Sequence, residues 1–385
     1  MRKICVVTGT RAEFGLLSSV IRLINESDKT QLQLVVTNMH LSPLYGETYK
    51  EIEACGFKID KKIPIIEEGY NDAVAILKSM AKAISGFADA FHDLKPDLIV
   101  ILGDRYEILA AAEAALIEKI PIAHIHGGEL TEGAYDDSIR HSITKMSNLH
   151  FTSTEEYRKR VIQLGEQPEH VFYVGSLGVE NVKKIPLFSK DEIENSIQFK
   201  IDKKTLLVTY HPVTLGLDSV KKEIYALITA FEARPDLRII FTMPNSDDSS
   251  EVIVEAINEF VERNIERSVA FKSLGLKRYL STMKYCGAVV GNSSSGLLEA
   301  PSFGIPTLNI GVRQSGRISC ESVLNCKSNK ESILKGLEKI LSPEFQQLAK
   351  NVQNPYEKSN TAEEIFKVIS TYAFKNLICK KFYDL

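Results

Sequence analysis

The sequence comprises 385 residues, of which 44% are hydrophobic and 25% charged, with 13 prolines and 22 glycines. This length and composition are typical of a globular protein of about two domains, and they exclude a disordered, collagen-like or low-complexity chain. The 47 Lys and Arg against 50 Asp and Glu give a net charge of -3, which argues against a nucleic-acid-binding protein but is compatible with a local anion site.

Short apolar runs alternate with stretches of helical periodicity in the first half of the chain. The runs expected to be strands are 4–7, 32–36, 98–102, 121–125, 149–153 and 171–175, and the expected helices are 12–26, 72–94, 106–118 and 135–146. Nearly continuous apolar strands bounded by helices are typical of a parallel sheet that is buried on both faces. We therefore expect a doubly wound, Rossmann-like α/β domain over residues 1–180.

The polar, lysine-rich stretch 183–203 shows no clear strand and fits an interdomain connection. The alternation then resumes, with expected strands at 205–210, 238–243, 287–291 and 306–310 and expected helices at 219–233, 251–264, 276–285 and 295–303. We expect a second Rossmann-like domain over residues 181–385, including a C-terminal helix. Two such domains facing a cleft would bind a ligand at the carboxyl ends of their strands.

The first expected strand runs into the segment TGTRAE, residues 8–13. Arg11 stands there at a strand end and a helix N-terminus, a position suited to a phosphate group, although an ion pair with a neighbouring acid is the alternative. The sequence contains neither G-x-G-x-x-G nor a P-loop motif. This argues against dinucleotide-dependent hydride transfer and against P-loop hydrolysis.

The next two expected strand tips carry candidate acid–base groups. Asp104 and Arg105 follow the run 98–102, and an acid beside an arginine stays ionised and can serve as a base or an electrostatic partner, although a helix N-cap role for Asp104 is equally compatible. The segment HIHGGE, residues 124–129, ends the next strand, and alternation puts both of its histidines on one face. Because no third ligand stands at a suitable spacing, we expect no metal.

The expected helix at 135–146 has two pairs of polar residues with opposite charge character. Asp136 and Arg140 stand one turn apart, and Asp137 and His141 repeat the spacing beside them. An exposed ladder of ion pairs is one interpretation. Because the pairs follow a glycine-rich strand tip, we favour residues of the ligand cleft.

Two segments of the second half carry further candidates. His211 follows the strand at 205–210, where a capped loop histidine is the alternative to a ligand-binding one. The segment GNSSSGLLEA, residues 291–300, puts small residues at a helix start, where amides and hydroxyls can hold a diphosphate and Glu299 can accept from ribose hydroxyls. Arg313 and Arg317 come later in the sequence, and we expect them to lie at the same interdomain cleft. A serine-rich capped turn with surface arginines is the alternative.

Together, in this order, TGTRAEFG, GDRYE, HIHGGE, DDSIRHSITK, HPVT, GNSSSGLLEA and GVRQSGR resemble the UDP-N-acetylglucosamine 2-epimerases, in particular the hydrolysing branch of sialic acid biosynthesis. The resemblance spans nearly the whole chain. It implies a GT-B-like pair of Rossmann-type domains, with UDP held mainly by the second domain and the sugar in the cleft. It also implies no hydride cofactor and no obligatory catalytic metal.

The resemblance assigns roles to individual residues. Asp104 and Asp136 would be the catalytic carboxylates, with Arg140 supporting Asp136. Many family members have glutamate in place of His126, so either His126 substitutes for it or Glu129 serves instead. The remaining residues implied for the UDP-sugar site are Arg11, Arg105, His211, Asn245, Ser293, Ser294, Ser295, Glu299 and Arg313, with uracil near Ser273 and Leu274.

The implied reaction releases UDP and N-acetylmannosamine from UDP-N-acetylglucosamine. Cleavage of the C1–O bond makes C1 cationic and acidifies the hydrogen on C2, so a base can remove it, and water then adds to the glucal-like intermediate. Ala12, where the non-hydrolysing branch commonly has proline, favours hydrolysis. The alternatives are a hydrolysing epimerase of a UDP-2,4-diacetamido-trideoxy sugar (legionaminic-type pathway), a non-hydrolysing epimerase, a glycosyltransferase of the same architecture and a noncatalytic UDP-sugar sensor.

Cysteine usage and targeting signals indicate the cellular setting. The six cysteines are scattered without a C-x-x-C pair, so we expect no disulfide framework. The first residues show no signal-peptide pattern, and no stretch of about 18 apolar residues occurs, which favours a cytoplasmic protein that does not bind membranes. The resemblance further implies a homo-oligomer, a dimer or a tetramer.

Overall fold

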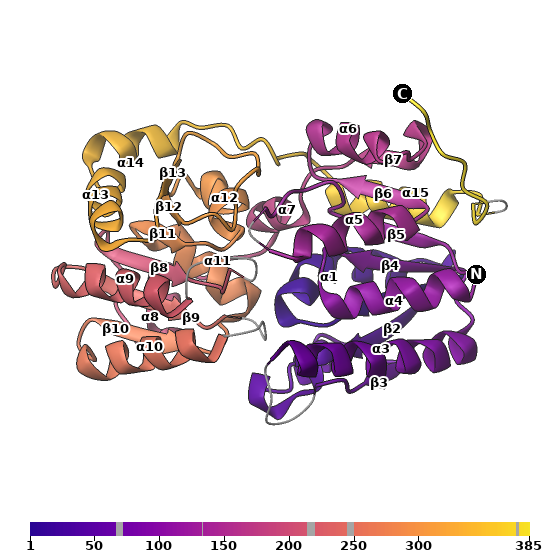
Figure 1. Ribbon diagram of the computed structural model, residues 1–385, viewed down its shortest axis with the longest axis horizontal. Helices are drawn as coiled ribbons and strands as arrows, with labels where there is room; N and C mark the ends of the chain where they lie inside the picture. Colours follow the sequence, from indigo (N-terminus) through magenta and orange to yellow (C-terminus); the bar gives the residue numbers. More distant parts are fainter. Residues whose placement is uncertain (67–71, 133, 214–219, 245–249, 375–376) are drawn as a thin grey trace. The chain divides into compact units, whose positions relative to one another are not determined.

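The computed structural model describes residues 1–66, 72–132, 134–213, 220–244, 250–374 and 377–385, which form two compact units (Figure 1). The first unit comprises Met1–Glu129, Asp136–Glu180 and Lys358–Leu385, and the second comprises Leu130–Tyr135 and Asn181–Glu357. Within the described ranges, no helix has the length and apolar character needed to cross a membrane.

The first unit is built on a seven-stranded parallel sheet. Its strands are β1 (Arg2–Thr8), β2 (Thr30–Thr37), β3 (Lys61–Ile63), β4 (Leu98–Leu102), β5 (Ile122–Ile125), β6 (Leu149–Thr152) and β7 (Val171–Tyr173), in the order β3-β2-β1-β4-β5-β6-β7. Its helices are α1 (Arg11–Glu26), α2 (Tyr49–Ala54), α3 (Ala73–Leu94), α4 (Tyr106–Ile117), α5 (Asp136–Met146), α6 (Glu155–Gln163) and α15 (Thr361–Thr371), with α7 (Leu177–Lys184) at the passage to the second unit.

Both faces of this sheet are buried, as the apolar runs predict. Ile4 and Val6 of β1 belong to one hydrophobic core, and Cys5 and Val7 between them belong to another on the opposite face. The second core also contains residues of α3 and α4, which lie side by side in Figure 1. Three further turns occur as 3₁₀ helices: η1 (Asn38–Leu41), η2 (Pro43–Tyr45) and η3 (Pro168–His170).

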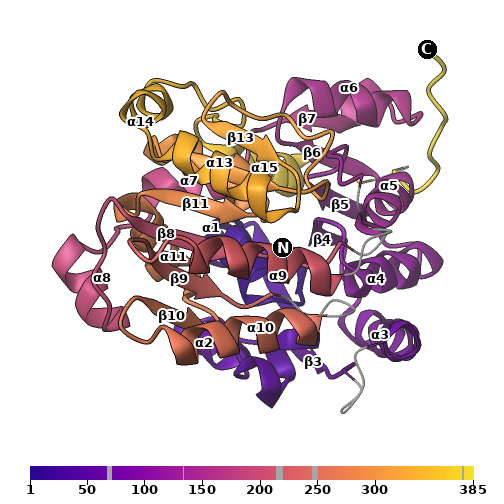
Figure 2. The same ribbon diagram turned by 60° about the vertical axis from the view of Figure 1, so that its left-hand side comes forward.

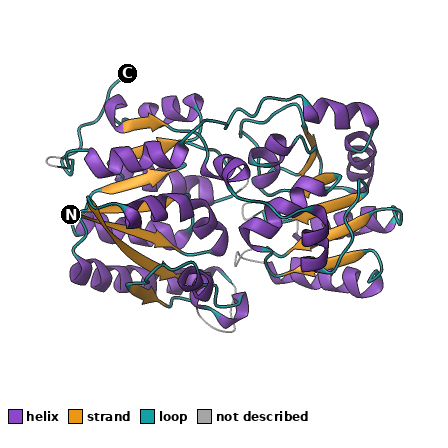
Figure 3. Ribbon diagram, turned by 180° about the vertical axis from the view of Figure 1, so that it is seen from behind, coloured by secondary structure: helices purple, strands orange, loops and turns teal. Residues whose placement is uncertain are grey.

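The second unit repeats the plan with a six-stranded parallel sheet. Its strands are β8 (Thr205–Thr209), β9 (Arg238–Thr242), β10 (Ser268–Phe271), β11 (Ala288–Gly291), β12 (Thr307–Ile310) and β13 (Val323–Cys326), in the order β10-β9-β8-β11-β12-β13. Its helices are α8 (Lys190–Ile197), α9 (Val220–Glu232), α10 (Ser250–Arg263), α11 (Gly275–Tyr285), α12 (Ser295–Leu298), η4 (Ala300–Phe303), α13 (Lys330–Ile340) and α14 (Pro343–Lys350). Figure 2 shows α9 and α10 beside this sheet, and Figure 3 shows the alternation of strands and helices in each unit. The predicted fold class, two doubly wound α/β domains, is confirmed.

The end of the chain belongs to the first unit, whereas the sequence predicts it in the second domain. Ile365 and Ile369 of α15 are wholly buried in the core that contains Ile4 of β1. Thr361 at the start of α15 also donates to the carbonyl of Val174 at 2.7 Å. The apolar face of α15 therefore completes one face of the first sheet, and 181–385 is not a single unit.

The stretch 183–203, expected to be a connection, contains the helix α8. Ser189 caps this helix by accepting from the amide of Glu192, and the Glu192 side chain accepts from the amide of Ser189 in return. This reciprocal arrangement satisfies two amides that have no partner within the helix. Ile193 and Ile197 bury the apolar face of α8 in a core of the second unit.

Candidate active site

The tip of β4 carries Asp104 and Arg105 directly before α4. Arg105 occupies the N-cap position of α4, so the alternative interpretation of Asp104 as that N-cap is wrong. Nε of Arg105 donates to Oε1 of the wholly buried Glu107 at 2.7 Å. The Asp104 carboxylate is bound by the guanidinium of Arg140 from α5. The two residues of this tip therefore belong to two separate ion pairs.

Arg140 joins three segments of the first unit. Its side chain is buried, its guanidinium binds Asp104, and its Nη1 donates to the carbonyl of Glu129 at 2.8 Å. Nη1 also lies 3.6 Å from Oδ1 of Asp137. The structure thus shows Asp104 and Asp137 as acidic partners of Arg140. The support of Asp136, the first residue of α5, by Arg140 stays a prediction.

His126 and Glu129 lie close together in the loop that follows β5. β5 ends at Ile125 and His126 has a φ of 66°, in the left-handed region, so the strand alternation used to put His124 and His126 on one face does not extend to His126. Nδ1 of His126 lies 3.6 Å from Oε1 of Glu129. The same carboxylate oxygen accepts from Oγ of Ser153 at 2.8 Å. The two candidates for the acid–base role are thus neighbours in one cluster.

The polar groups at the tip of β1 form hydrogen bonds and ion pairs with other residues of the first unit. Nε of Arg11 lies 2.7 Å from Oε2 of Glu51, which is the ion pair that the sequence offers as the alternative to phosphate binding. The amide of Gly9 donates to Oε2 of Glu13 at 2.6 Å. A Cβ at Gly9 would lie 2.4 Å from Oε1 of Glu107, so the close packing here requires glycine. A role of Arg11 toward a substrate stays a prediction.

The buried Glu13 makes stability depend on pH. Burial, and secondarily the charge of Glu107, raises the pKa of Glu13 from 4.5 to about 8. Between these two pH values the folded state binds more protons than the unfolded state, so the free energy of unfolding falls as pH rises. We expect Glu13→Gln to reduce the fall in thermal unfolding midpoint between pH 5 and pH 8. An equal fall in the wild type and in the variant would contradict this origin.

His211 and Asn292 connect two strand tips in the second unit. The amide of His211 donates to Oδ1 of Asn292 at 2.7 Å, and Nδ2 of Asn292 donates to the carbonyl of His211 at 2.8 Å. The carbonyl of Asn292 in turn accepts from Nε2 of Gln314 at 2.8 Å and from Nη1 of Arg313 at 3.2 Å. The predicted His211, the serine-rich segment and the predicted Arg313 therefore form one hydrogen-bonded cluster, in which Asn292 and Gln314 are residues that the sequence does not single out.

The serine-rich segment is shorter as a helix than predicted. α12 has four residues, and Glu299 separates it from the 3₁₀ turn η4, so the expected helix 295–303 is not continuous. Ser295 is held by the hydroxyl of Tyr279, and its Oγ lies 3.3 Å from that of Ser293. Burial raises the pKa of Tyr279 to about 12, so this phenol stays neutral. Ser294 is the N-cap residue of α12.

The residues predicted to lie near uracil differ in accessibility. Leu274 is buried in a core of the second unit, so its side chain is unavailable to a ligand. Oγ of Ser273 accepts from the amide of Gly275 at 3.3 Å, at the start of α11. Asn245 lies outside the described residues. A uracil contact of Ser273 or of the Leu274 backbone stays a prediction.

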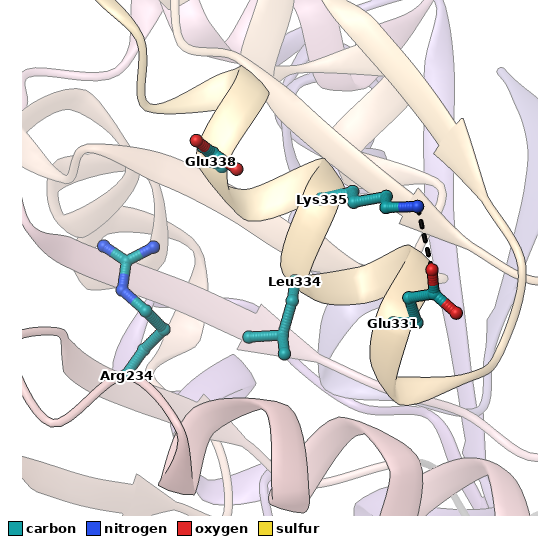
Figure 4. Close-up of a pocket in the computed structure, with 5 residues that line it drawn as sticks. All are labelled: Arg234, Glu331, Leu334, Lys335 and Glu338. Carbon is teal, nitrogen blue, oxygen red and sulfur yellow. Dashed lines mark hydrogen bonds and ion pairs between the residues drawn. The ribbon is translucent and has the colours of Figure 1, made fainter.

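A surface hollow of the second unit lies apart from these clusters (Figure 4). It is lined by Arg234 and, on α13, by Glu331, Leu334, Lys335 and Glu338. Lys335 pairs with Glu331 at 2.8 Å within it. None of the lining residues is a predicted site residue, and exposed ion pairs one turn apart are typical of a solvated helix face.

Three known proteins are similar to the chain along nearly its whole length. It is 45% identical over 346 residues to GDP/UDP-N,N'-diacetylbacillosamine 2-epimerase (hydrolyzing) of Campylobacter jejuni, covering 90% of this chain and 89% of that protein. It is 40% identical over 387 residues to polysialic acid biosynthesis protein P7 of Escherichia coli, covering 100% and 98%. It is 36% identical over 386 residues to UDP-N,N'-diacetylbacillosamine 2-epimerase (hydrolyzing) of Legionella pneumophila, covering 99% of both.

Family and structure comparisons agree with these relatives. The family model described as UDP-N-acetylglucosamine 2-epimerase matches residues 22–370. The structure of MnaA of S. aureus with UDP superposes with a TM-score of 0.80 at 20% identity, covering 100% of both chains. At this identity the likeness concerns the fold.

Proposed function

The chain belongs to the UDP-N-acetylglucosamine 2-epimerase family, on its hydrolysing branch, and from this premise we propose that it converts a UDP-linked 2-acetamido sugar into UDP and the free sugar inverted at C2. The observation that carries the proposal is the 45% identity, over 90% of the chain, to a relative named as a hydrolyzing 2-epimerase. The clusters around Arg140 and Asn292 support it, because they contain the residue types that acid–base chemistry and diphosphate binding require.

We propose a UDP-2,4-diacetamido-2,4,6-trideoxy sugar as the substrate. The relatives of Campylobacter jejuni and Legionella pneumophila are both named for N,N'-diacetylbacillosamine, a sugar of this type. This substrate is one of the alternatives that the sequence analysis leaves open, whereas the main hypothesis there is UDP-N-acetylglucosamine. The latter remains the second candidate because the 40% identical relative is named for polysialic acid biosynthesis.

The proposed reaction has two steps, an elimination of UDP and an addition of water. In the first, a base removes the hydrogen on C2, the C2–H electron pair forms the C1=C2 double bond, and the C1–O bond breaks to release UDP. In the second, water supplies the hydroxyl at C1, and a proton returns to C2 from the opposite face. Cationic character at C1 makes the C2 hydrogen acidic, so the two bond cleavages belong together.

We assign the removal of the C2 proton to His126, assisted by Glu129. A carboxylate close to one ring nitrogen orients an imidazole and stabilises its protonated form, and the 3.6 Å separation between His126 and Glu129 supports such a pair. We assign to Asp104 the stabilisation of positive charge at C1, because its carboxylate is held by Arg140. Asp136 remains a candidate for returning the proton to C2.

We assign the nucleotide to the second unit. Arg313 contributes a positive charge for the diphosphate, and Ser293 and Ser294 contribute hydroxyls and amides. The hydrogen bond from Arg313 to the Asn292 carbonyl supports this assignment, because it ties the arginine to the serine-rich segment. Glu299 accepts from the ribose hydroxyls.

Isotope exchange tests the reaction. Incubated in deuterated water with the UDP-2,4-diacetamido-2,4,6-trideoxy sugar, without nicotinamide or metal, the protein should release UDP and a free sugar with deuterium at C2, observed by NMR. Product without deuterium at C2 would exclude proton exchange at that carbon. A faster turnover of UDP-N-acetylglucosamine in parallel reactions would select the second candidate.

Replacing Glu299 by alanine should weaken UDP binding. The loss of a charged hydrogen bond costs about 1.5–3 kcal/mol, which corresponds to a roughly ten- to hundredfold higher Kd. Calorimetric titration with UDP measures this, with Glu344→Ala on the exposed side of α14 as the control. An unchanged Kd for Glu299→Ala would refute the assignment of the ribose contact.

A further inference from the structure

His124 lies on β5, two residues before His126, and the proposed reaction gives it no role. Its side chain is wholly buried, and both of its ring nitrogens have partners. Nε2 lies 2.7 Å from the carbonyl of Gly103, and Nδ1 lies 3.2 Å from Oγ1 of Thr144. Since a carbonyl oxygen only accepts, Nε2 carries the hydrogen, and Nδ1 accepts from the threonine hydroxyl. Burial lowers the pKa of His124 to about 3, in keeping with this neutral form.

The two partners of His124 are directly connected to the Asp104–Arg140 pair. Gly103 precedes Asp104, and its peptide is held on both sides, because its amide donates to the carbonyl of Ile125 at 3.0 Å while its carbonyl accepts from His124. Thr144 follows Arg140 by one turn of α5, so both residues lie on the same side of that helix. His124 thereby fixes the backbone from which each member of the ion pair projects.

The loop with His126 and Glu129 also packs against this point. A Cβ at Gly127 would lie 3.0 Å from Oγ1 of Thr144 and 3.1 Å from Nδ1 of His124, so the loop backbone lies directly over that hydrogen bond. The tip of β4, the loop after β5 and α5 therefore meet at one imidazole.

We propose that His124 is a positioning residue, which holds the tip of β4 and α5 at the separation that the Asp104–Arg140 pair needs for catalysis. The proposal rests on the proposed function for its kinetic consequence, but its geometric part does not. Displacing a catalytic group by about 1 Å can lower a rate roughly a hundredfold, so even a modest shift of Gly103 would be measurable.

Nitrogen-15 NMR of the imidazole in the ligand-free protein tests the geometry without any turnover. We expect His124 to remain the neutral Nε2–H tautomer from pH 5 to pH 8. A protonated ring or the Nδ1–H tautomer in this range would overturn the proposal. Because this readout needs no substrate, its failure is distinguishable from a failure of the proposed function.

Kinetics of a matched set of variants test the consequence. His124→Leu should lower kcat about ten- to a hundredfold and leave the Kd for UDP unchanged, whereas His124→Gln, which keeps a donor at the Nε2 position, should restore most of the loss. His150→Leu is the control, because His150 is an equally buried histidine, paired with His124 in the sheet register, that binds Glu166 instead. It should lose thermal stability but keep kcat per folded molecule. A folded His124→Leu with the kcat of the wild type would refute the positioning role.

Thr144 on α5, the second hydrogen-bond partner of His124, provides a pair of variants that perturb the packing less. Thr144→Val removes the hydroxyl that donates to His124 without changing the volume, and Thr144→Ser keeps it. We expect kcat to fall for valine and to stay near the wild-type value for serine. If His124→Leu does not fold, this pair decides the question, and equal kcat values for valine and serine would overturn the proposal.

Discussion

Replacing Asp104 by asparagine is expected to lower kcat at least about a hundredfold, the usual range for the loss of a group that acts by charge or proton transfer. Asparagine keeps the shape of the side chain but removes the negative charge that Arg140 holds at the tip of β4. The Kd for UDP should barely change, because the residues assigned to the nucleotide belong to the second unit. Steady-state turnover and calorimetry of UDP binding measure the two quantities.

A matched control and a competing variant sharpen this test. Asp93→Asn on α3 removes an acid of the same unit that pairs with Lys61, and it should keep kcat. His126→Gln should also abolish most turnover if His126 is the base. A folded Asp104→Asn protein with nearly normal kcat would show that Asp104 is structural and would refute its assignment to the stabilisation of positive charge at C1.

The central strands were predictable because parallel strands buried on both faces appear as unbroken apolar runs. β4, with the sequence LIVIL, is entirely buried and is recognised at once. The edge strand β13, VLNC, has only its first residue buried, and the edge strand β3 has three residues, so neither produces such a run. The helix α8 is not predicted for another reason. Its sequence signal is the capping pair Ser189 and Glu192, which lies in a stretch of polar composition.

The strand tips of the site were predictable, and so was the pair of Asp137 and His141 one turn apart on α5, which lie 3.6 Å apart, but the long-range pairs were not. The apolar runs that precede them indicate that Asp104 and His126 lie near carboxyl ends of strands. Which acid Arg140 binds depends on how far α5 lies from β4. Arg140 and Asp104 are 36 positions apart in the sequence, so spacing along the chain does not predict their contact. Similarly, Tyr279 reaches Ser295 from another helix, so spacing within the serine-rich segment gives no hint of it. Long-range partner choice requires the tertiary structure.

Replacing Arg140 by methionine should produce both a kinetic and a thermodynamic loss. Arg140 is 2% exposed, whereas the side chain of Asp104 is 23% exposed, so the variant leaves a partly buried carboxylate without its cation. Breaking a buried pair costs about 3–5 kcal/mol, and we expect the lower end because Asp104 retains contact with water. The same variant should lower kcat at least about a hundredfold, since Asp104 loses the group that holds it. Unfolding by denaturant and steady-state kinetics test the two parts.

A double-mutant cycle separates these contributions. If Arg140 acts through Asp104, combining Arg140→Met with Asp104→Asn should lower kcat little further than either change alone, because residues that act as a unit are not additive. The combined variant should also be more stable than Arg140→Met by itself, because it no longer contains the unpaired carboxylate. Arg158→Met is the matched control, since Arg158 also donates to backbone carbonyls of the first unit but has no predicted catalytic partner. It should cost stability and keep kcat, and losses in kcat that simply multiply in the cycle would show that Arg140 and Asp104 serve separate steps.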